Sequence, residues 1–157
     1  MNQTLQVPGP RYGALLQLLR AAETIWNGSR LFFTRWDLSP SQFNILNLLK
    51  DLPDGLSQVD LSRQLIMHRS NVTGLVDRLE ARGLVQRLET PGDRRSYRVI
   101  LTAAGNQLIR EILPHYFFAA EAVWGSISVQ HVNRLMTDLD EIMANANGIS
   151  QRNLHQN

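Results

Sequence analysis

The sequence contains no cysteine, and this absence excludes thiol catalysis, disulfide bonds, cysteine-based zinc sites and thiol redox sensing. It has no apolar run that approaches the roughly 20 residues needed to span a bilayer. Residues 1–10 also lack the basic and apolar segments of a secretory signal peptide. We therefore expect a cytoplasmic protein. Its 157 residues, 43% of them hydrophobic, predict a single domain over 1–157 that buries a core.

Lysine is scarce as well, because Lys50 is the only lysine among 16 basic residues. Eight arginines fall within residues 63–98 against four acidic residues, so this segment carries +4 although the chain carries only +2. Arginine is planar and has several donors, which suits phosphates and base edges. The charge distribution predicts a polyanion-binding middle segment, with an ordinary solvated charged face as the alternative.

Apolar residues recur at helical spacing along most of the chain and predict a mainly α-helical fold with a small β-hairpin. A long first helix is expected over about 12–36, loosened near residues 27–29. Ser39 is followed by a proline and, at the third position, by Gln42. This pattern predicts a capping box at the start of the second helix.

The middle of the chain predicts two helices followed by a hairpin. Ser57 is expected to cap a short third helix, and a fourth is expected over 69–82, ended by Gly83. Two strand-like runs, 84–89 and 96–101, are separated by turn-forming residues. A helix-turn-helix followed directly by a basic hairpin is a winged helix.

Two further helices are expected after the hairpin. Thr102 is the predicted N-cap of the fifth helix, which Pro114 should kink or interrupt. Ser128 is the predicted cap of the sixth, and the polar tail after Gly148 is expected to fray.

The fourth helix has a buried stripe and an opposite face of small polar residues. Such short side chains let a helix lie deep in the major groove, where Ser, Thr, Asn and Arg reach base edges. A solvated face is the alternative. The residues of this helix predicted to contact DNA are Arg69, Ser70, Asn71, Thr73, Gly74, Asp77 and Arg78.

The hairpin strengthens this interpretation. Val99 and Leu101 alternate onto one face, which must pack on the helices, and the same alternation places Arg95 beyond the edge of the core. Arg94 and Arg98 are expected to point the other way, toward phosphates.

Three segments resemble the MarR (multiple antibiotic resistance) family of transcriptional regulators. Residues 93–102, DRRSYRVILT, resemble the family's wing signature, an Asp-x-Arg followed by Val-x-Leu-Thr. Residues 71–85 resemble its recognition helix running into the first wing strand, and residues 38–43 resemble the start of its second helix. The resemblance covers roughly residues 12–146.

The resemblance implies a repressor that binds a pseudo-palindromic DNA operator as a homodimer. It implies a winged helix-turn-helix lobe over about 39–102, with dimerisation helices over about 11–36 and 103–147. It also implies that Arg95 is the wing-tip arginine and that Asp93 orients it. Gly74 stands where the family commonly carries a larger polar or basic side chain.

Aromatic residues gather near the first helix and the start of the second. Core packing is one interpretation; the other is an apolar effector pocket. The family resemblance implies that the ligand of such a pocket is a small aromatic or phenolic anion. The predicted pocket residues are Trp26, Phe33, Trp36 and Phe43. The basic residues that would balance such an anion are Arg20, Arg30, Arg35 or His115.

Enzyme, metal and cofactor functions find no support in the motifs. The four histidines are scattered without ligand spacing, and the sequence has no phosphate-binding loop and no nucleophile elbow. We expect no catalytic residues, no metal site and no cofactor. The alternative function is a winged-helix protein-interaction or dimerisation module without a DNA role.

Overall fold

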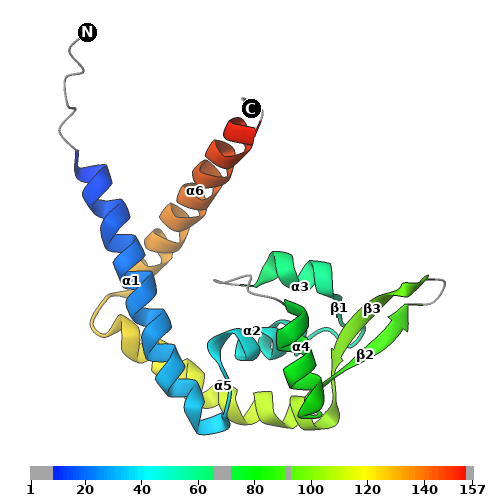
Figure 1. The fold of residues 1–157 in the computed structure, drawn as a ribbon. Helices are drawn as coiled ribbons and strands as arrows, with labels where there is room; N and C mark the ends of the chain where they lie inside the picture. The colour runs from blue at the N-terminus through cyan, green and yellow to red at the C-terminus, as the bar shows by residue number, and fades with distance from the viewer. Residues whose placement is uncertain (1–8, 66–71, 91–92, 155–157) are drawn as a thin grey trace. The chain divides into compact units, whose positions relative to one another are not determined.

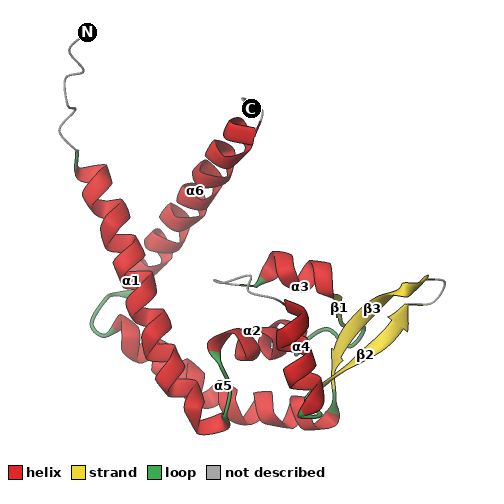
Figure 2. Cartoon of the chain, in the orientation of Figure 1, coloured by secondary structure: helices red, strands yellow, loops and turns green. Residues whose placement is uncertain are grey.

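The computed structural model describes the backbone of residues 9–65, 72–90 and 93–154, and the side chains of these ranges except 90, 93–96 and 150–154. The fold is mainly α-helical with one small sheet, as predicted (Figures 1 and 2). In chain order the elements are α1 (Pro10–Phe33), the short 3-10 helix η1 (Thr34–Trp36), α2 (Pro40–Leu49), β1 (Leu56–Ser57), α3 (Gln58–Gln64), α4 (Val72–Ala81), β2 (Val85–Thr90), β3 (Asp93–Leu101), α5 (Ala103–Trp124) and α6 (Val129–Leu154).

The chain divides into two compact units, Met1–Ile112 and Leu113–Asn157. The first unit contains the helix-turn-helix and the sheet, and the second contains the end of α5 and all of α6. Within the described ranges, no helix is long and apolar enough to cross a membrane.

Helix α1 is α-helical through residues 27–29, so the predicted loosening there is wrong. The helix stops three residues earlier than predicted, and η1 completes the segment. Asp37 follows with φ +53°, in the left-handed region, and turns the chain toward α2.

The predicted caps of α2 and α3 are confirmed. The Gln42 N–H donates to Ser39 Oγ at 3.2 Å, and the Ser39 N–H donates to Gln42 Oε1 at 2.8 Å. The Asp60 N–H donates to Ser57 Oγ at 3.1 Å. Local sequence therefore fixes where both helices begin.

Helix α5 begins as predicted, because the Gly105 N–H donates to Thr102 Oγ1 at 3.0 Å. Pro114 lies inside α5, and the helix is not interrupted there. Proline removes only one backbone donor, so a long helix with other hydrogen bonds can continue past it.

In the second unit, the cap of α6 is also confirmed, since the His131 N–H donates to Ser128 Oγ at 3.3 Å. The expected fraying after Gly148 is wrong, because α6 continues to Leu154. A polar sequence can remain helical when no proline ends the helix.

The core of the first unit is apolar and draws on almost all of its elements. Its largest fully buried side chains are those of Phe33, Phe43, Ile45, Leu46, Leu49, Leu61, Leu79, Ile109, Ile112, Val76, Val85 and Val99. Burial of this many large side chains is the main term that stabilises the lobe.

The sheet has three antiparallel strands in the order β1-β3-β2. In β3, Val99 lies opposite both Leu56 of β1 and Arg87 of β2. The sequence predicted only the hairpin, because a two-residue strand such as β1 has no periodicity of its own. Asp93 and Arg94, predicted as part of the turn, belong to β3.

Gly55 and Gly83 both have positive φ, but only Gly55 also lies too close to neighbouring atoms for a side chain. A Cβ added to Gly55 (φ +65°) would lie 2.1 Å from the Val99 carbonyl oxygen, whereas no described atom lies within 4 Å of a Cβ on Gly83 (φ +66°). Gly55 is therefore required both for its φ and for the close approach of its loop to β3.

We predict that Gly83→Ala lowers the free energy of unfolding by about 1–2 kcal/mol, the cost of a left-handed non-glycine residue. Gly55→Ala should cost about 1–3 kcal/mol more, because the added methyl group also overlaps β3. Urea unfolding followed by circular dichroism measures both. Equal losses would contradict the steric role of Gly55.

Candidate nucleic-acid interface

The predicted orientation of α4 is confirmed for the part of the helix that the structure describes. Its buried stripe consists of Val72, Leu75, Val76 and Leu79. Thr73, Asp77 and Arg78 are exposed and Gly74 is half-buried. The other predicted contacts, Arg69, Ser70 and Asn71, lie outside the described residues. The exposed face of α4 is therefore short and polar, with one long basic side chain.

The C-terminal end of α4 is held by backbone and side-chain bonds. The Gly83 N–H donates to the Glu80 carbonyl at 2.8 Å, and the Leu84 N–H donates to the Leu79 carbonyl at 2.9 Å. These two bonds satisfy carbonyls that every helix leaves without a partner at its end. The turn then leads directly into β2, so the position of α4 sets where the hairpin begins.

Arg82 attaches the same end of α4 to the segment that follows α1. Its guanidinium donates to the Trp36 carbonyl at 3.1 Å and to the Asp37 carbonyl, and the Asp37 carboxylate lies 3.8 Å away. A charged donor bound to backbone carbonyls is a stronger attachment than an exposed ion pair.

Arg87 joins β2 to α4. Its Nη2 donates to Asp77 Oδ1 at 2.5 Å, its Nη1 donates to Glu80 Oε2, and its backbone N–H donates to Glu80 Oε1 at 3.0 Å. Burial alone lowers the pKa of Arg87, but the hydrogen bonds and charges of Asp77 and Glu80 outweigh it and raise the pKa above its ordinary value. Asp77, predicted as a DNA contact, therefore has a partner within the lobe.

Arg98, predicted to point toward phosphates, has partners within the lobe. Its side chain is half-buried, with Nε donating to the Asp54 carbonyl at 2.6 Å and Nη2 donating to the Gly55 carbonyl at 2.5 Å. The loop before β1 presents its carbonyls to β3, and the guanidinium fork matches two of them at once.

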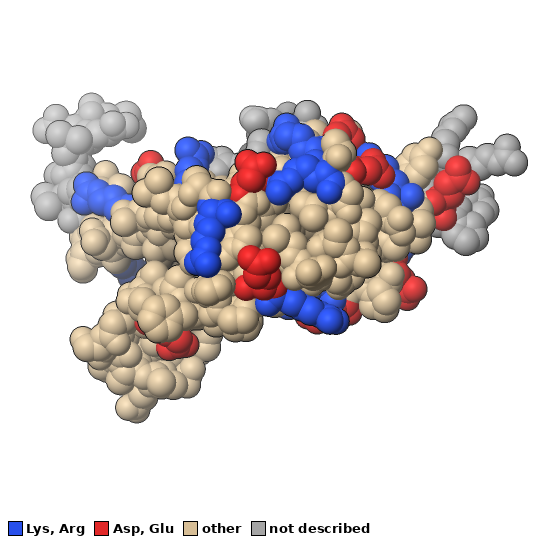
Figure 3. Space-filling model, turned by 90° about the horizontal axis from the view of Figure 1, so that it is seen from below, with Lys and Arg blue, Asp and Glu red and all other residues tan. Residues whose placement is uncertain are grey.

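The basic segment therefore has two kinds of arginine. Those with partners inside the lobe are Arg63, Arg82, Arg87 and Arg98. Arg78 is exposed, while Arg69 and the side chains of Asp93, Arg94 and Arg95 lie outside the description. On the face that Figure 3 presents, basic side chains lie beside acidic ones.

Most of the predicted effector-pocket aromatics form core. Phe33 and Phe43 stack with ring centroids 4.3 Å apart, and each is 1% exposed. Trp36 is buried, and its Nε1 donates to Glu111 Oε1 at 2.7 Å. These three residues pack in the core and do not line the pocket beside them, because large aromatic side chains at the α1–α2 junction fill space within the lobe.

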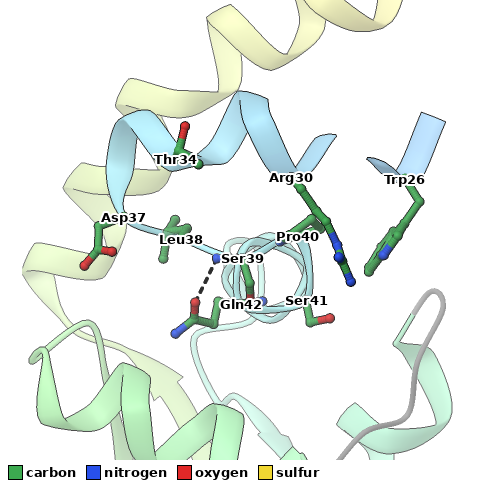
Figure 4. A pocket seen from close by; sticks show the side chains of 9 residues that line it. All are labelled: Trp26, Arg30, Thr34, Asp37, Leu38, Ser39, Pro40, Ser41 and Gln42. Carbon is green, nitrogen blue, oxygen red and sulfur yellow. Dashed lines mark hydrogen bonds between the residues drawn. The ribbon is translucent and has the colours of Figure 1, made fainter. Parts of the chain in front are cut away.

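A pocket of about 430 Å³ lies beside this cluster and includes the fourth predicted residue (Figure 4). It is lined by Trp26, Arg30, Thr34, Asp37, Leu38, Ser39, Pro40, Ser41 and Gln42. Trp26 and Arg30 extend from α1 toward Ser41 at the start of α2 (Figure 4). Of the four basic residues that the sequence offered as counter-charges, Arg30 is the one that lines this pocket, and it lies beside Trp26.

The MarR family model matches residues 36–96, from the end of η1 into β3. The regulator FarR of Neisseria gonorrhoeae is 30% identical over 128 residues, which cover 80% of this chain and 87% of FarR. The chain belongs to the MarR family of transcriptional regulators. The match to the family model includes both the recognition helix and most of the wing.

Other MarR-like proteins match the chain over different lengths. The transcriptional repressor MprA of Escherichia coli K12 is 32% identical over 90 residues, 53% of this chain and about half (51%) of MprA. A solved structure of BpsR from Bordetella bronchiseptica, whose DNA binding is regulated by 6-hydroxynicotinic acid, is 26% identical with a TM-score of 0.72. That match covers 85% of this chain and 98% of BpsR.

Sequence reasoning missed the structural roles of Arg82 and Arg87. A signal for Arg87 was present, because Asp77 and Glu80 are three residues apart and therefore share one side of a helix that runs into β2. No comparable signal exists for Arg82, whose acceptors are backbone carbonyls 45 and 46 positions away in the sequence.

We predict that Arg98→Met lowers the free energy of unfolding by about 1.5–3 kcal/mol, because two carbonyls lose a charged donor. Arg63→Met removes the same charge from an exposed pair with Asp60 and should cost at most about 0.5 kcal/mol. Urea unfolding of both variants checks this. Similar small losses would show that Arg98 does not anchor the loop before β1.

Proposed function

We propose that the chain is a sequence-specific DNA-binding repressor that binds a pseudo-palindromic operator as a homodimer. The observation that carries this proposal is the short polar face of α4, held beside the β2–β3 hairpin by Arg87. Membership of the MarR family supports it, as does the regulated DNA binding of BpsR.

In this proposal α4 enters the major groove. Thr73 and Arg78 are exposed there, and Gly74 lets the helix backbone approach the bases closely. Arg69, Ser70 and Asn71 would complete the contact from the N-terminal side of the helix. In the major groove arginine forms its best hydrogen bonds with guanine and asparagine with adenine. Serine and threonine can hydrogen-bond to either base.

The hairpin would act as the wing. β3 begins at Asp93, which lies opposite Thr90, and the register then shifts so that Tyr97 lies opposite Glu89. The arginines at 94 and 95 therefore fall in an irregular part of β3, between two pairs that hold it to β2. We assign Arg94 to phosphates, Arg95 to the narrow, negative minor groove at A·T-rich steps, and Asp93 to the orientation of Arg95.

The dimer would cover apolar surface that each unit leaves exposed. On α1 the exposed large apolar side chains are Tyr12, Leu15, Leu19, Ile25 and Leu31. In the second unit they are Phe117, Phe118, Val123, Ile127, Val129, Leu135, Met136, Ile142, Met143 and Ile149. Soluble monomers rarely expose apolar area on this scale, so we assign residues 11–36 and 103–147 to dimerisation.

We predict that the wild-type protein selects, from randomised duplex DNA, sequences with two half-sites about one helical turn apart. Arg95→Ala should weaken binding to the selected duplex by about 1–3 kcal/mol, measured by fluorescence anisotropy, and leave the melting temperature unchanged. Arg63→Ala is the matched control, because Arg63 is an exposed arginine on α3 that is assigned neither to DNA contact nor to dimerisation. Absence of any selected sequence would support the protein-interaction alternative.

The pocket beside α2 is the proposed effector site. Trp26 offers a flat apolar surface and Arg30 a positive charge, which together suit a small aromatic carboxylate. Such a ligand shifts DNA binding only by the difference between its affinities for the DNA-bound and released conformations.

We predict that salicylate or 6-hydroxynicotinic acid at millimolar concentration raises the melting temperature and releases the selected duplex. Arg30→Gln should abolish both responses, because the carboxylate loses its counter-charge. Arg63→Gln, which removes an exposed arginine on α3 away from the pocket lining, should keep them. Thermal shift and anisotropy measure the two responses, and identical behaviour of both variants would rule out this pocket.

A further inference from the structure

Arg87 lies at the centre of a contact between three elements of the lobe. It occupies the middle of β2, opposite Val99 of the central strand. Its guanidinium reaches Asp77 and Glu80 on α4. The Gln58 amide at the start of α3, turned with its oxygen toward Arg87, accepts from Nη2 at 3.2 Å and from Nε at 3.3 Å.

The donors of Arg87 are directed at the protein. A guanidinium has five N–H donors, and Nε, Nη1 and Nη2 each face an acceptor on α3 or α4. Two carboxylates also balance its single positive charge, and only 21% of its side chain is exposed. These features suit a side chain that holds elements together and do not suit a phosphate ligand.

We propose that Arg87 is a positioning residue that fixes the wing relative to the recognition helix and thereby sets operator affinity without contacting DNA. The inference rests on the proposed DNA-binding function. A helix in the major groove and a wing in the adjacent minor groove must bind simultaneously, so their relative placement decides how many contacts form together.

Two-stranded ribbons twist and bend readily, and β1 pairs only with residues 98 and 99 of β3. Beyond that point no other strand among the described residues pairs with β3 on this side. Arg87 lies where this support ends, and its backbone N–H and side chain both bind Glu80. Loss of Arg87 leaves the hairpin folded but free to change its angle to α4.

The charge of Glu80 makes a sharp test possible. Removal of a negative charge near a polyanion should tighten DNA binding if electrostatics alone matters. The positioning role predicts the opposite sign, because Glu80→Gln weakens the attachment of Arg87. Glu80 is not among the residues proposed to contact DNA, so its substitution does not remove a base contact.

The experiment measures binding of the full chain to the selected duplex and to a shuffled duplex over a range of salt concentrations. Arg87→Met should weaken binding to the selected duplex about tenfold and reduce its preference over the shuffled duplex. Glu80→Gln should weaken it in the same direction, and the double variant should bind no worse than Arg87→Met alone. Arg87→Lys, with a compact ammonium in place of the fork, should recover only part of the affinity.

Several results would overturn the proposal. A salt slope lower by about one in Arg87→Met would show that Arg87 binds a phosphate. Tighter binding by Glu80→Gln, or wild-type binding by Arg87→Met, would show that the attachment does not set affinity. Arg63→Met controls for loss of charge, because Arg63 is exposed and is assigned neither to DNA contact nor to dimerisation. Glu80→Gln decides the question if Arg87→Met fails to fold. A wild-type chain that binds no duplex would overturn the proposed function itself.

Discussion

The winged lobe depends on the position of β3 at the centre of its sheet. β1 leads into α3 and β2 leads out of α4, and both strands pair with β3. The helix-turn-helix is therefore tied at both of its ends to one strand, whose Val99 is fully buried. This arrangement requires glycine at position 55, because the loop there lies against the backbone of β3 and leaves no room for a side chain. The exposed face of α4 therefore belongs to one packed unit of helices and sheet, and not to two independent helices.

Arginine content alone is a poor measure of nucleic-acid contact in this lobe. The composition of residues 63–98 suggested one basic surface, yet Arg82 and Arg98 bind backbone carbonyls and Arg87 binds two carboxylates. The same chemistry underlies both roles, since a planar fork that matches phosphate oxygens also matches carbonyls and carboxylates. Only the surroundings of each side chain distinguish them. The arginines that the proposal leaves for DNA are Arg69, Arg78, Arg94 and Arg95.

The features predicted correctly from sequence are those determined within a few residues. Ser39, Ser57, Thr102 and Ser128 each mark a helix start, because capping is a contact between positions three apart. The buried stripe of α4 follows from its periodicity. The sequence could not reveal β1, whose two residues are strand only because β3 lies beside them. It also could not distinguish aromatic core from aromatic pocket, since that depends on how α1 and α2 pack.

The proposed effector pocket and the recognition helix share a segment of backbone. Asp37 lines the pocket, and its carbonyl, with that of Trp36, accepts the hydrogen bonds of Arg82 at the end of α4. Trp36 is in turn fixed by its bond to Glu111 on α5. A ligand that displaces this segment must move the two carbonyls that accept from Arg82. The hydrogen bonds of Arg82 are then strained or broken. The proposed effector pocket and α4 are thus connected through a few named bonds, and a ligand with different affinities for two positions of this segment would also act on α4.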